Sequence, residues 1–161
     1  MEKALDEKRL DAFSRNFASA LFAAYPEWRR SAEMFEALDA STHCLLVRIP
    51  APAESRAAYP LLITTDNEDV TIGFDSYHSH FEWPCADNEC GNPLAFIADL
   101  LCERLKVVSF WQDDKWCGSQ TLAAGEELGR ARYVSGAANR VEVRSWHGRF
   151  SADQALPAVD L

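Results

Sequence analysis

The stretch that decides the fold is PLLITTDNEDVTIGF, which covers residues 60–74. Both of its ends are short apolar runs rich in Ile, Val and Thr, and its centre is Asp-Asn-Glu-Asp, which is a turn composition. The pattern predicts strands over residues 60–65 and 70–74, joined by a hairpin over residues 66–69. Residues 43–49 have the same strand composition, and short connections favour antiparallel pairing of the three strands.

Helices are predicted before and after this hairpin. From Leu10 to Tyr25, apolar residues recur at spacings of three and four, which indicates an amphipathic helix that Pro26 ends. Asn92 and Pro93 form a strong helix start, because asparagine caps free amides and proline at the first helical position loses no hydrogen bond. The helices expected on these grounds, together with a short one capped by Ser31, cover residues 5–25, 32–38 and 93–105.

The last third of the chain is predicted to return to strands. Its apolar runs are short, and two of them flank Ser-Gly-Ala-Ala-Asn, a composition that predicts a second hairpin. From Gly148 the chain is polar and contains proline, so residues 148–161 are expected to be a tail. The strands expected here are residues 106–111, 116–122, 130–134 and 140–144.

These elements together predict an α+β fold. Consecutive strands joined by short turns pair antiparallel, and the helices are grouped before and between the two strand groups. We therefore expect a single domain over residues 1–147, with one mainly antiparallel sheet and helices packed on one of its faces.

The composition is that of a globular protein. The chain has 161 residues, of which 48% are hydrophobic and 25% charged. No window approaches the ~18 consecutive apolar residues of a membrane-spanning helix, and the N-terminus lacks the apolar region of a secretory signal, so a cytoplasmic location without membrane contact is expected. The cysteines are odd in number, and disulfides are not expected. They are Cys44, Cys85, Cys90, Cys102 and Cys117.

The net charge of -9 is concentrated in one segment. No Lys or Arg occurs between Arg56 and Arg104, whereas nine of the 25 acidic residues do, and the rest of the chain balances 16 acids against 16 bases. Such a segment repels nucleic-acid phosphates and attracts cationic surfaces. The charge pattern therefore disfavours nucleic-acid binding and favours a basic protein partner.

Aromatic residues are mixed with acidic ones in residues 75–89. Rings that are only partly needed for a core, surrounded by charge of one sign, are typical of protein interfaces, where the rings supply buried area and the acids steer a basic partner. The alternative is that individual rings belong to the core. The residues predicted to bind a partner are Asp66, Glu68, Asp69, Asp75, Tyr77, His78, His80, Phe81, Glu82, Trp83, Asp87 and Glu89.

A zinc site is an alternative interpretation of the same segment. If the strand from Val70 continues, His78 and His80 lie on the face that carries Val70, at ~7 Å from each other. Cys85 and Cys90 could then complete a site of two histidines and two cysteines. The spacing of the two cysteines is wider than in the usual zinc knuckle, so we predict no metal and no cofactor.

A hydrolase is a further alternative, with either histidine paired to Asp75 and with Cys85, Cys117 or a serine as nucleophile. The carboxylates Asp113, Asp114, Glu126 and Glu127 could likewise form an acid–base site. However, the chain contains no nucleophile-elbow motif, no phosphate-binding glycine loop and no zinc-protease helix motif. We therefore predict no catalytic residues.

The run VTIGFDSYHSHFEW, residues 70–83, follows a hydrophobic hairpin and precedes a capped helix in a small acidic chain. In this respect the sequence resembles bacterial immunity proteins of polymorphic toxin systems, including those of contact-dependent growth inhibition. The resemblance implies a non-enzymatic protein that binds and blocks one cognate toxin domain, often a basic nuclease. The expected function is therefore an immunity protein, and the alternative is a zinc-binding protein or small metal-dependent hydrolase centred on His78 and His80.

Overall fold

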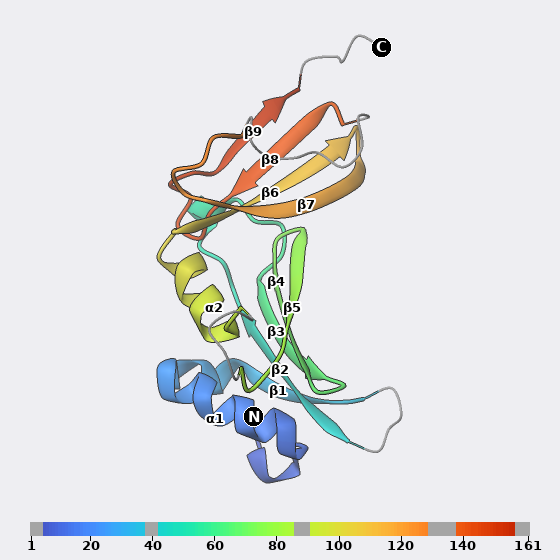
Figure 1. Ribbon diagram of the computed structural model, residues 1–161, viewed down its shortest axis with the longest axis vertical. Coiled ribbons are helices and arrows are strands. Elements are labelled where there is room, and N and C mark those ends of the chain that lie inside the picture. The colour runs from blue at the N-terminus through green and yellow to red at the C-terminus, as the bar shows by residue number, and fades with distance from the viewer. Residues whose placement is uncertain (1–4, 38–41, 86–90, 129–137, 157–161) are drawn as a thin grey trace. The chain divides into compact units, whose positions relative to one another are not determined.

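The computed structural model describes residues 5–37, 42–85, 91–128 and 138–156, which form two compact units (Figure 1). Unit 1 comprises residues 1–50, 60–73 and 78–97, and unit 2 comprises residues 51–59, 74–77 and 98–161. Because each unit is assembled from three separate segments, no single position in the sequence divides them. The single domain expected over residues 1–147 stays a prediction.

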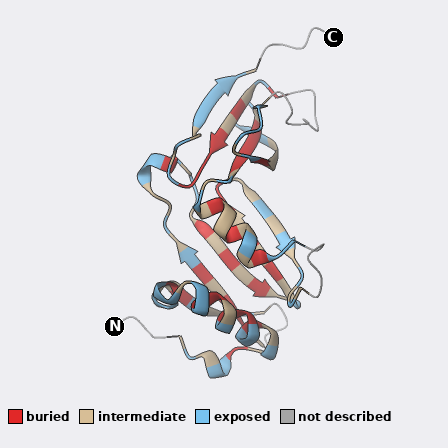
Figure 2. Cartoon of the chain, turned by 60° about the vertical axis from the view of Figure 1, so that its left-hand side comes forward, coloured by how far each residue is buried: buried red, intermediate tan, exposed pale blue. Residues whose placement is uncertain are grey.

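Unit 1 is built around a five-stranded sheet with neighbours in sequence order, β1-β2-β3-β4-β5. Buried residues, red in Figure 2, alternate with less buried ones along β3 and β4, because successive side chains of a strand point to opposite faces. The buried face includes Val47, Ile63 and Ile72, which lie on adjacent strands in register. The strands are β1 (Ala32–Glu36), β2 (His43–Ile49), β3 (Leu61–Asp66), β4 (Asp69–Phe74) and β5 (Tyr77–Phe81).

The helix α1 (Ala12–Ala24) packs on this sheet between two short 3-10 helices, η1 (Glu7–Arg9) and η2 (Pro26–Ser31). Asp11 caps α1 by accepting a hydrogen bond from the Ser14 amide at 2.6 Å. The Ser14 hydroxyl contacts the Thr65 hydroxyl of β3 at 2.5 Å, and both residues are fully buried. The predicted helix over residues 5–25 is thus confirmed for residues 12–24 and ends before Pro26 as expected.

The predicted helix over residues 32–38 is wrong, because residues 32–36 form β1. β1 pairs antiparallel with β2, which places Ala32 opposite Val47 and Met34 opposite Leu45. A short apolar run fits the periodicity of a helix and that of a strand equally well. Here it forms a strand because the neighbouring strand supplies its backbone hydrogen bonds. Leu38 lies outside the described residues.

Unit 2 contains a second sheet, of order β7-β6-β8-β9, together with the 3-10 helix η3 (Ala53–Ser55). The described core on one face of this sheet includes Val108, Phe110 and Val141. The helix α2 (Pro93–Leu101) precedes the sheet, and its last four residues count with unit 2. The strands are β6 (Leu105–Gln112), β7 (Lys115–Ala123), β8 (Arg140–Arg144) and β9 (Ala152–Ala155).

The α+β class with antiparallel sheets is confirmed, and the structure differs from the expectation in having two sheets instead of one. The tail expected from Gly148 is wrong for residues 152–155, which pair antiparallel with β8 as β9. The strand expected over residues 130–134 and the last residues of the chain lie outside the described residues. In the described part of the chain, no helix is long and apolar enough to cross a membrane.

Candidate functional site

The hairpin between β3 and β4 has a loop of two residues, Asn67 and Glu68, closed by the pair Asp66–Asp69. The φ angles are 51° at Asn67 and 57° at Glu68, so both loop residues are left-handed, as in a type I′ turn. Asparagine tolerates this region, but the second position usually carries glycine, since a Cβ is disfavoured there. Glu68 is therefore at a place where the backbone favours a residue without a side chain.

The carboxylates of this hairpin differ in exposure: Glu68 is exposed, whereas Asp66 and Asp69 are half-buried. The exposed Glu68 has no hydrogen-bond or ion-pair partner within the described ranges, and Asp66 contacts only the Cys44 sulfur, at 3.9 Å. Asp69 Oδ2 lies 2.5 Å from Nδ1 of His80, whose side chain is 60% exposed. We call Asp66, Glu68, Asp69 and His80 the acidic hairpin surface; all four belong to unit 1.

The two histidines lie on β5, which is a separate strand and not a continuation of β4. The chain reverses at Asp75 and Ser76, where φ of Asp75 is 52°. His78 and His80 are exposed, with ring centroids 5.5 Å apart, whereas Val70 is fully buried. The prediction that both histidines share the face of Val70 is therefore wrong, although they do lie side by side.

The zinc arrangement is not assembled by the residues that the structure describes. His80 is held by Asp69, and its Nδ1 also lies 3.0 Å from the Thr71 hydroxyl. Cys85 is disulfide-bonded, so it has no thiolate to offer a metal. No group of three or more His, Cys, Asp or Glu side chains among residues 5–37, 42–85, 91–128 and 138–156 is placed to hold a metal ion. Cys90 lies outside these ranges.

The disulfide at Cys85 contradicts the expectation that the cysteines are all free. Cys44, Cys102 and Cys117 carry free thiols. Burial, together with the nearby carboxylates Asp11 and Asp66, raises the pKa of Cys44 to about 11, so this thiol stays protonated and is a poor nucleophile. Disulfides persist in oxidising compartments, whereas the cytoplasm, the location expected from the sequence, keeps cysteines reduced.

The predicted aromatic residues serve the fold at least in part. Trp83 Nε1 donates a hydrogen bond to Asn16 Oδ1 at 2.8 Å, and its ring meets Phe17 edge-on at 5.4 Å. The Phe81 ring lies 5.1 Å from that of Phe96. These contacts fasten the end of β5 to α1 and to the start of α2. Both rings are half-buried, so their observed role is to stabilise unit 1, and their role in an interface stays a prediction.

The remaining predicted residues fall in different places. Asp75 and the half-buried Tyr77 belong to unit 2. Asp75 is buried, and its Oδ1 accepts a hydrogen bond from the Ala58 amide at 2.7 Å, so it is not part of an exposed surface. Glu82 is exposed directly after β5. Asp87 and Glu89 lie outside the described residues.

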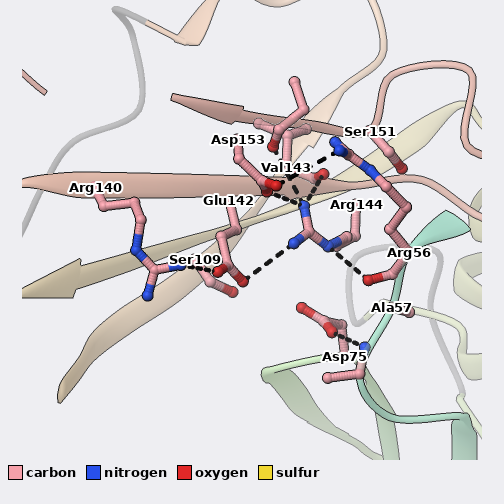
Figure 3. Close-up of polar contacts among 12 residues, drawn as sticks. Arg56, Ala57, Asp75, Ser109, Arg140, Glu142, Val143, Arg144, Ser151 and Asp153 are labelled. Carbon is pink, nitrogen blue, oxygen red and sulfur yellow. Dashed lines mark hydrogen bonds and ion pairs between the residues drawn. The ribbon is translucent and has the colours of Figure 1, made fainter. Parts of the chain in front are cut away.

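Asp75 lies beside a buried charge network in unit 2 that is centred on Arg144 (Figure 3). The Arg144 guanidinium donates to the Arg56 carbonyl at 3.0 Å and forms ion pairs with Glu142 at 3.3 Å and with Asp153 at 2.6 Å. Since Arg144 is only 7% exposed, these partners satisfy a charge that would otherwise be costly to bury. The network holds β8, β9 and residues 51–59 together, which is a structural role.

Two other acids of the base-free segment are also structural. Asp99 forms an ion pair with Arg104 at 2.6 Å. Glu103 Oε1 accepts hydrogen bonds from the Ser145 hydroxyl and from the amides of His147 and Arg149. Burial by itself raises the pKa of Glu103, but these hydrogen bonds outweigh it and lower the pKa below the usual value. Among the described acids of the segment, the exposed ones are Glu68 at the tip of the hairpin and Glu82 directly after β5.

Two of the four acids considered for a hydrolase make hydrogen bonds with a structural role. Asp113 Oδ1 accepts a hydrogen bond from the Asn139 amide group at 2.8 Å, and Glu126 Oε2 accepts one from the Ala123 amide at 3.0 Å. Glu126 fixes its own turn in this way, whereas Asp113 ties the turn between β6 and β7 to Asn139, the residue before β8.

The sequence reasoning missed a cross-strand row on the second sheet, where Trp111 lies opposite Trp116 on β7 and opposite Arg140 on β8. Trp116 is 48% exposed, which is unusual for so large a ring. The signal in the sequence was the pair of tryptophans flanking the turn at Asp113 and Asp114.

The chain matches no protein-family model, no curated protein and no solved structure.

Proposed function

We propose that this protein is a non-enzymatic inhibitor that binds a basic protein partner, a toxin domain such as a nuclease, with its acidic hairpin surface. The observation that carries the proposal is Glu68. An acidic side chain at a left-handed position costs backbone free energy that glycine would avoid. The left-handed Asp75 and Glu103 are held by hydrogen bonds within the fold, whereas Glu68 is exposed and has no partner in the described ranges.

The charge distribution supports the same role. Asp66, Glu68 and Asp69 lie within four residues of each other, in a segment that contains no Lys or Arg between residues 56 and 104. In proteins, a patch of one sign accelerates the encounter with a partner of the opposite sign, and close contacts then set the lifetime of the complex. Binding over the cationic active region of a nuclease would exclude its anionic substrate without any chemistry by the inhibitor.

A co-expression experiment tests this function. We expect the open reading frame next to this one to encode a larger protein with a basic C-terminal domain. Expressed alone in a bacterial host, that domain should arrest growth, and this protein should restore growth. The purified pair should associate more slowly as salt is added, because exposed charge is screened over ~8 Å at physiological ionic strength.

Two matched variants test the surface. Asp66→Lys with Glu68→Lys should lose protection, whereas Glu27→Lys with Glu36→Lys, which changes the net charge equally at exposed positions of the same unit, should retain it. Both variants must melt cooperatively near the parent temperature. Equal protection by the two variants would contradict the proposed surface, and failure of the parent to restore growth would contradict the proposed function.

A further inference from the structure

The second sheet has one face that is covered at one end and open at the other. Near Arg144 this face is covered by residues 51–59, through the hydrogen bond to the Arg56 carbonyl. On β7, the Ser119 hydroxyl donates to the Ser76 carbonyl at 2.7 Å. Further along the same face, the row of Trp116, Trp111 and Arg140 crosses three adjacent strands, and Trp116 remains 48% exposed.

The row already holds one guanidinium group. The Arg140 guanidinium lies 5.3 Å from the centroid of the Trp111 ring, within the range of a cation–π interaction. Its charge is met by an ion pair with Glu142, and it also donates to the Asp113 carbonyl at 3.0 Å. Trp116 lies next in the row and has no cation over its ring among the described residues. Its indole is fixed, since Nε1 donates to the Ser119 hydroxyl at 2.8 Å.

The surroundings of the row are acidic. A groove of about 510 Å³ adjoins it and is lined by polar side chains, among them Asp113 and Asp114 at the β6–β7 turn. Asp114 has no ion-pair partner within the described ranges. Lys115 follows directly in sequence, but the alternation of strand β7 places it on the face opposite to Trp116. Glu142 is shared between Arg140 and Arg144, and the turn contributes the two further carboxylates of Asp113 and Asp114 to the groove beside the row.

From this geometry we infer that the Trp116–Trp111–Arg140 row is a second docking surface, and that it binds an arginine-bearing segment of a protein. A ligand guanidinium would stack on Trp116 as Arg140 stacks on Trp111, with the turn carboxylates opposite its charge. Exposed tryptophan and arginine are the residues that dominate the binding energy of protein interfaces. This surface lies wholly in unit 2, whereas the acidic hairpin surface belongs to unit 1.

Nuclear magnetic resonance tests the inference with a defined probe. Each tryptophan indole N–H gives its own peak in a proton–nitrogen spectrum, and single Trp→Phe variants assign the peaks. A short peptide of alternating arginine and glycine is titrated into the full-length protein, with a glutamate–glycine peptide as the charge control. We expect the Trp116 and Trp111 peaks to shift saturably with the arginine peptide only, while the peak of the buried Trp28 stays in place.

Matched variants test whether the peptide binds the Trp116–Trp111–Arg140 row or any exposed aromatic ring. Trp116→Ala should weaken the arginine peptide about tenfold, and Trp116→Phe should keep most of the affinity because a ring remains. Tyr59→Ala is the control, since Tyr59 is also in unit 2 and is 61% exposed but lies outside the row. The inference is overturned if neither peptide moves the two peaks, if both peptides move them equally, or if Tyr59→Ala loses as much affinity as Trp116→Ala.

Discussion

Replacing Glu68 by glycine should make the protein more stable and a poorer binder. Glu68 has φ of 57°, where a Cβ costs about 1–2 kcal/mol for a regular L-residue. Glycine removes that cost, but it also increases the conformational entropy of the unfolded chain, which lowers the free energy of unfolding by about 0.5–1 kcal/mol. The net gain expected for Glu68→Gly is about 0.5–1 kcal/mol, which raises the melting temperature of a chain of this size by about 1–4 °C.

The variant Glu68→Gln separates backbone strain from charge. It keeps a side chain of the same length at the same φ, so its free energy of unfolding should lie within about 0.5 kcal/mol of the parent value. Both variants remove one carboxylate from the tip of the hairpin, and both should therefore slow the association with a basic partner at low salt by roughly two- to fivefold. Urea denaturation gives the stabilities, and stopped-flow mixing gives the association rates.

Two results for Glu68→Gly would contradict the expected exchange of stability for binding. A Glu68→Gly variant that unfolds at a lower urea concentration than the parent would show that the side chain stabilises the turn, and the argument that it is kept for binding would lose its basis. A gain in stability with an unchanged association rate would instead confirm the strain and remove the role of the carboxylate in steering.

Three further perturbations have clear expected outcomes. Trp83→Ala should lower the free energy of unfolding, measured by urea denaturation, by about 2–3 kcal/mol, because it loses a half-buried ring and the hydrogen bond to Asn16. A variant that loses binding but keeps its full stability would instead show that Trp83 contacts the partner. Glu103 has a folded-state pKa below its unfolded value, so the stability it contributes is present above an unfolded pKa of about 4.3 and is lost as the pH falls through the folded value. Glu103→Gln should therefore be less stable than the parent near neutral pH, with a gap that closes in acid; a gap independent of pH would contradict this. A thiol reagent at pH about 8 should modify the exposed Cys102 in the folded protein and leave Cys44, with its pKa of about 11, unmodified until the protein unfolds. Mass spectrometry of the two cysteine-containing peptides measures the labelling of each thiol. Equal labelling of both would refute the burial of Cys44.

The elements that could be predicted from the sequence are those whose signals are local. The hairpin over residues 66–69 was predictable because its turn composition separates two runs of strand formers, and Asn92 marked the start of α2 through its capping side chain, which accepts the Leu94 amide at 2.9 Å. Residues 32–36 were not, because a short apolar run fits helix and strand alike until its partner strand is known.

The candidate site was predictable to a similar degree. Glu68 is exposed as expected, whereas Asp66 and Asp69 are half-buried and contact Cys44 and His80. Asp75 was misplaced because its partner is the backbone amide of Ala58, and the row of Trp111 and Trp116 was missed because it depends on the register of β6 with β7. Contacts of this kind are set by the tertiary fold, and no local pattern encodes them.

The interleaving of the two units also has a consequence for how the protein is made. All three segments of unit 1 have been synthesised once Ile97 has left the ribosome, so this unit has its full sequence while the chain is still growing. The contacts that residues 51–59 and 74–77 make within unit 2 form later, because the strands β6 to β9 are translated last. Until then the Arg56 carbonyl lacks the hydrogen bond that the Arg144 guanidinium later donates to it. A nascent chain therefore displays the acidic hairpin before the second sheet exists.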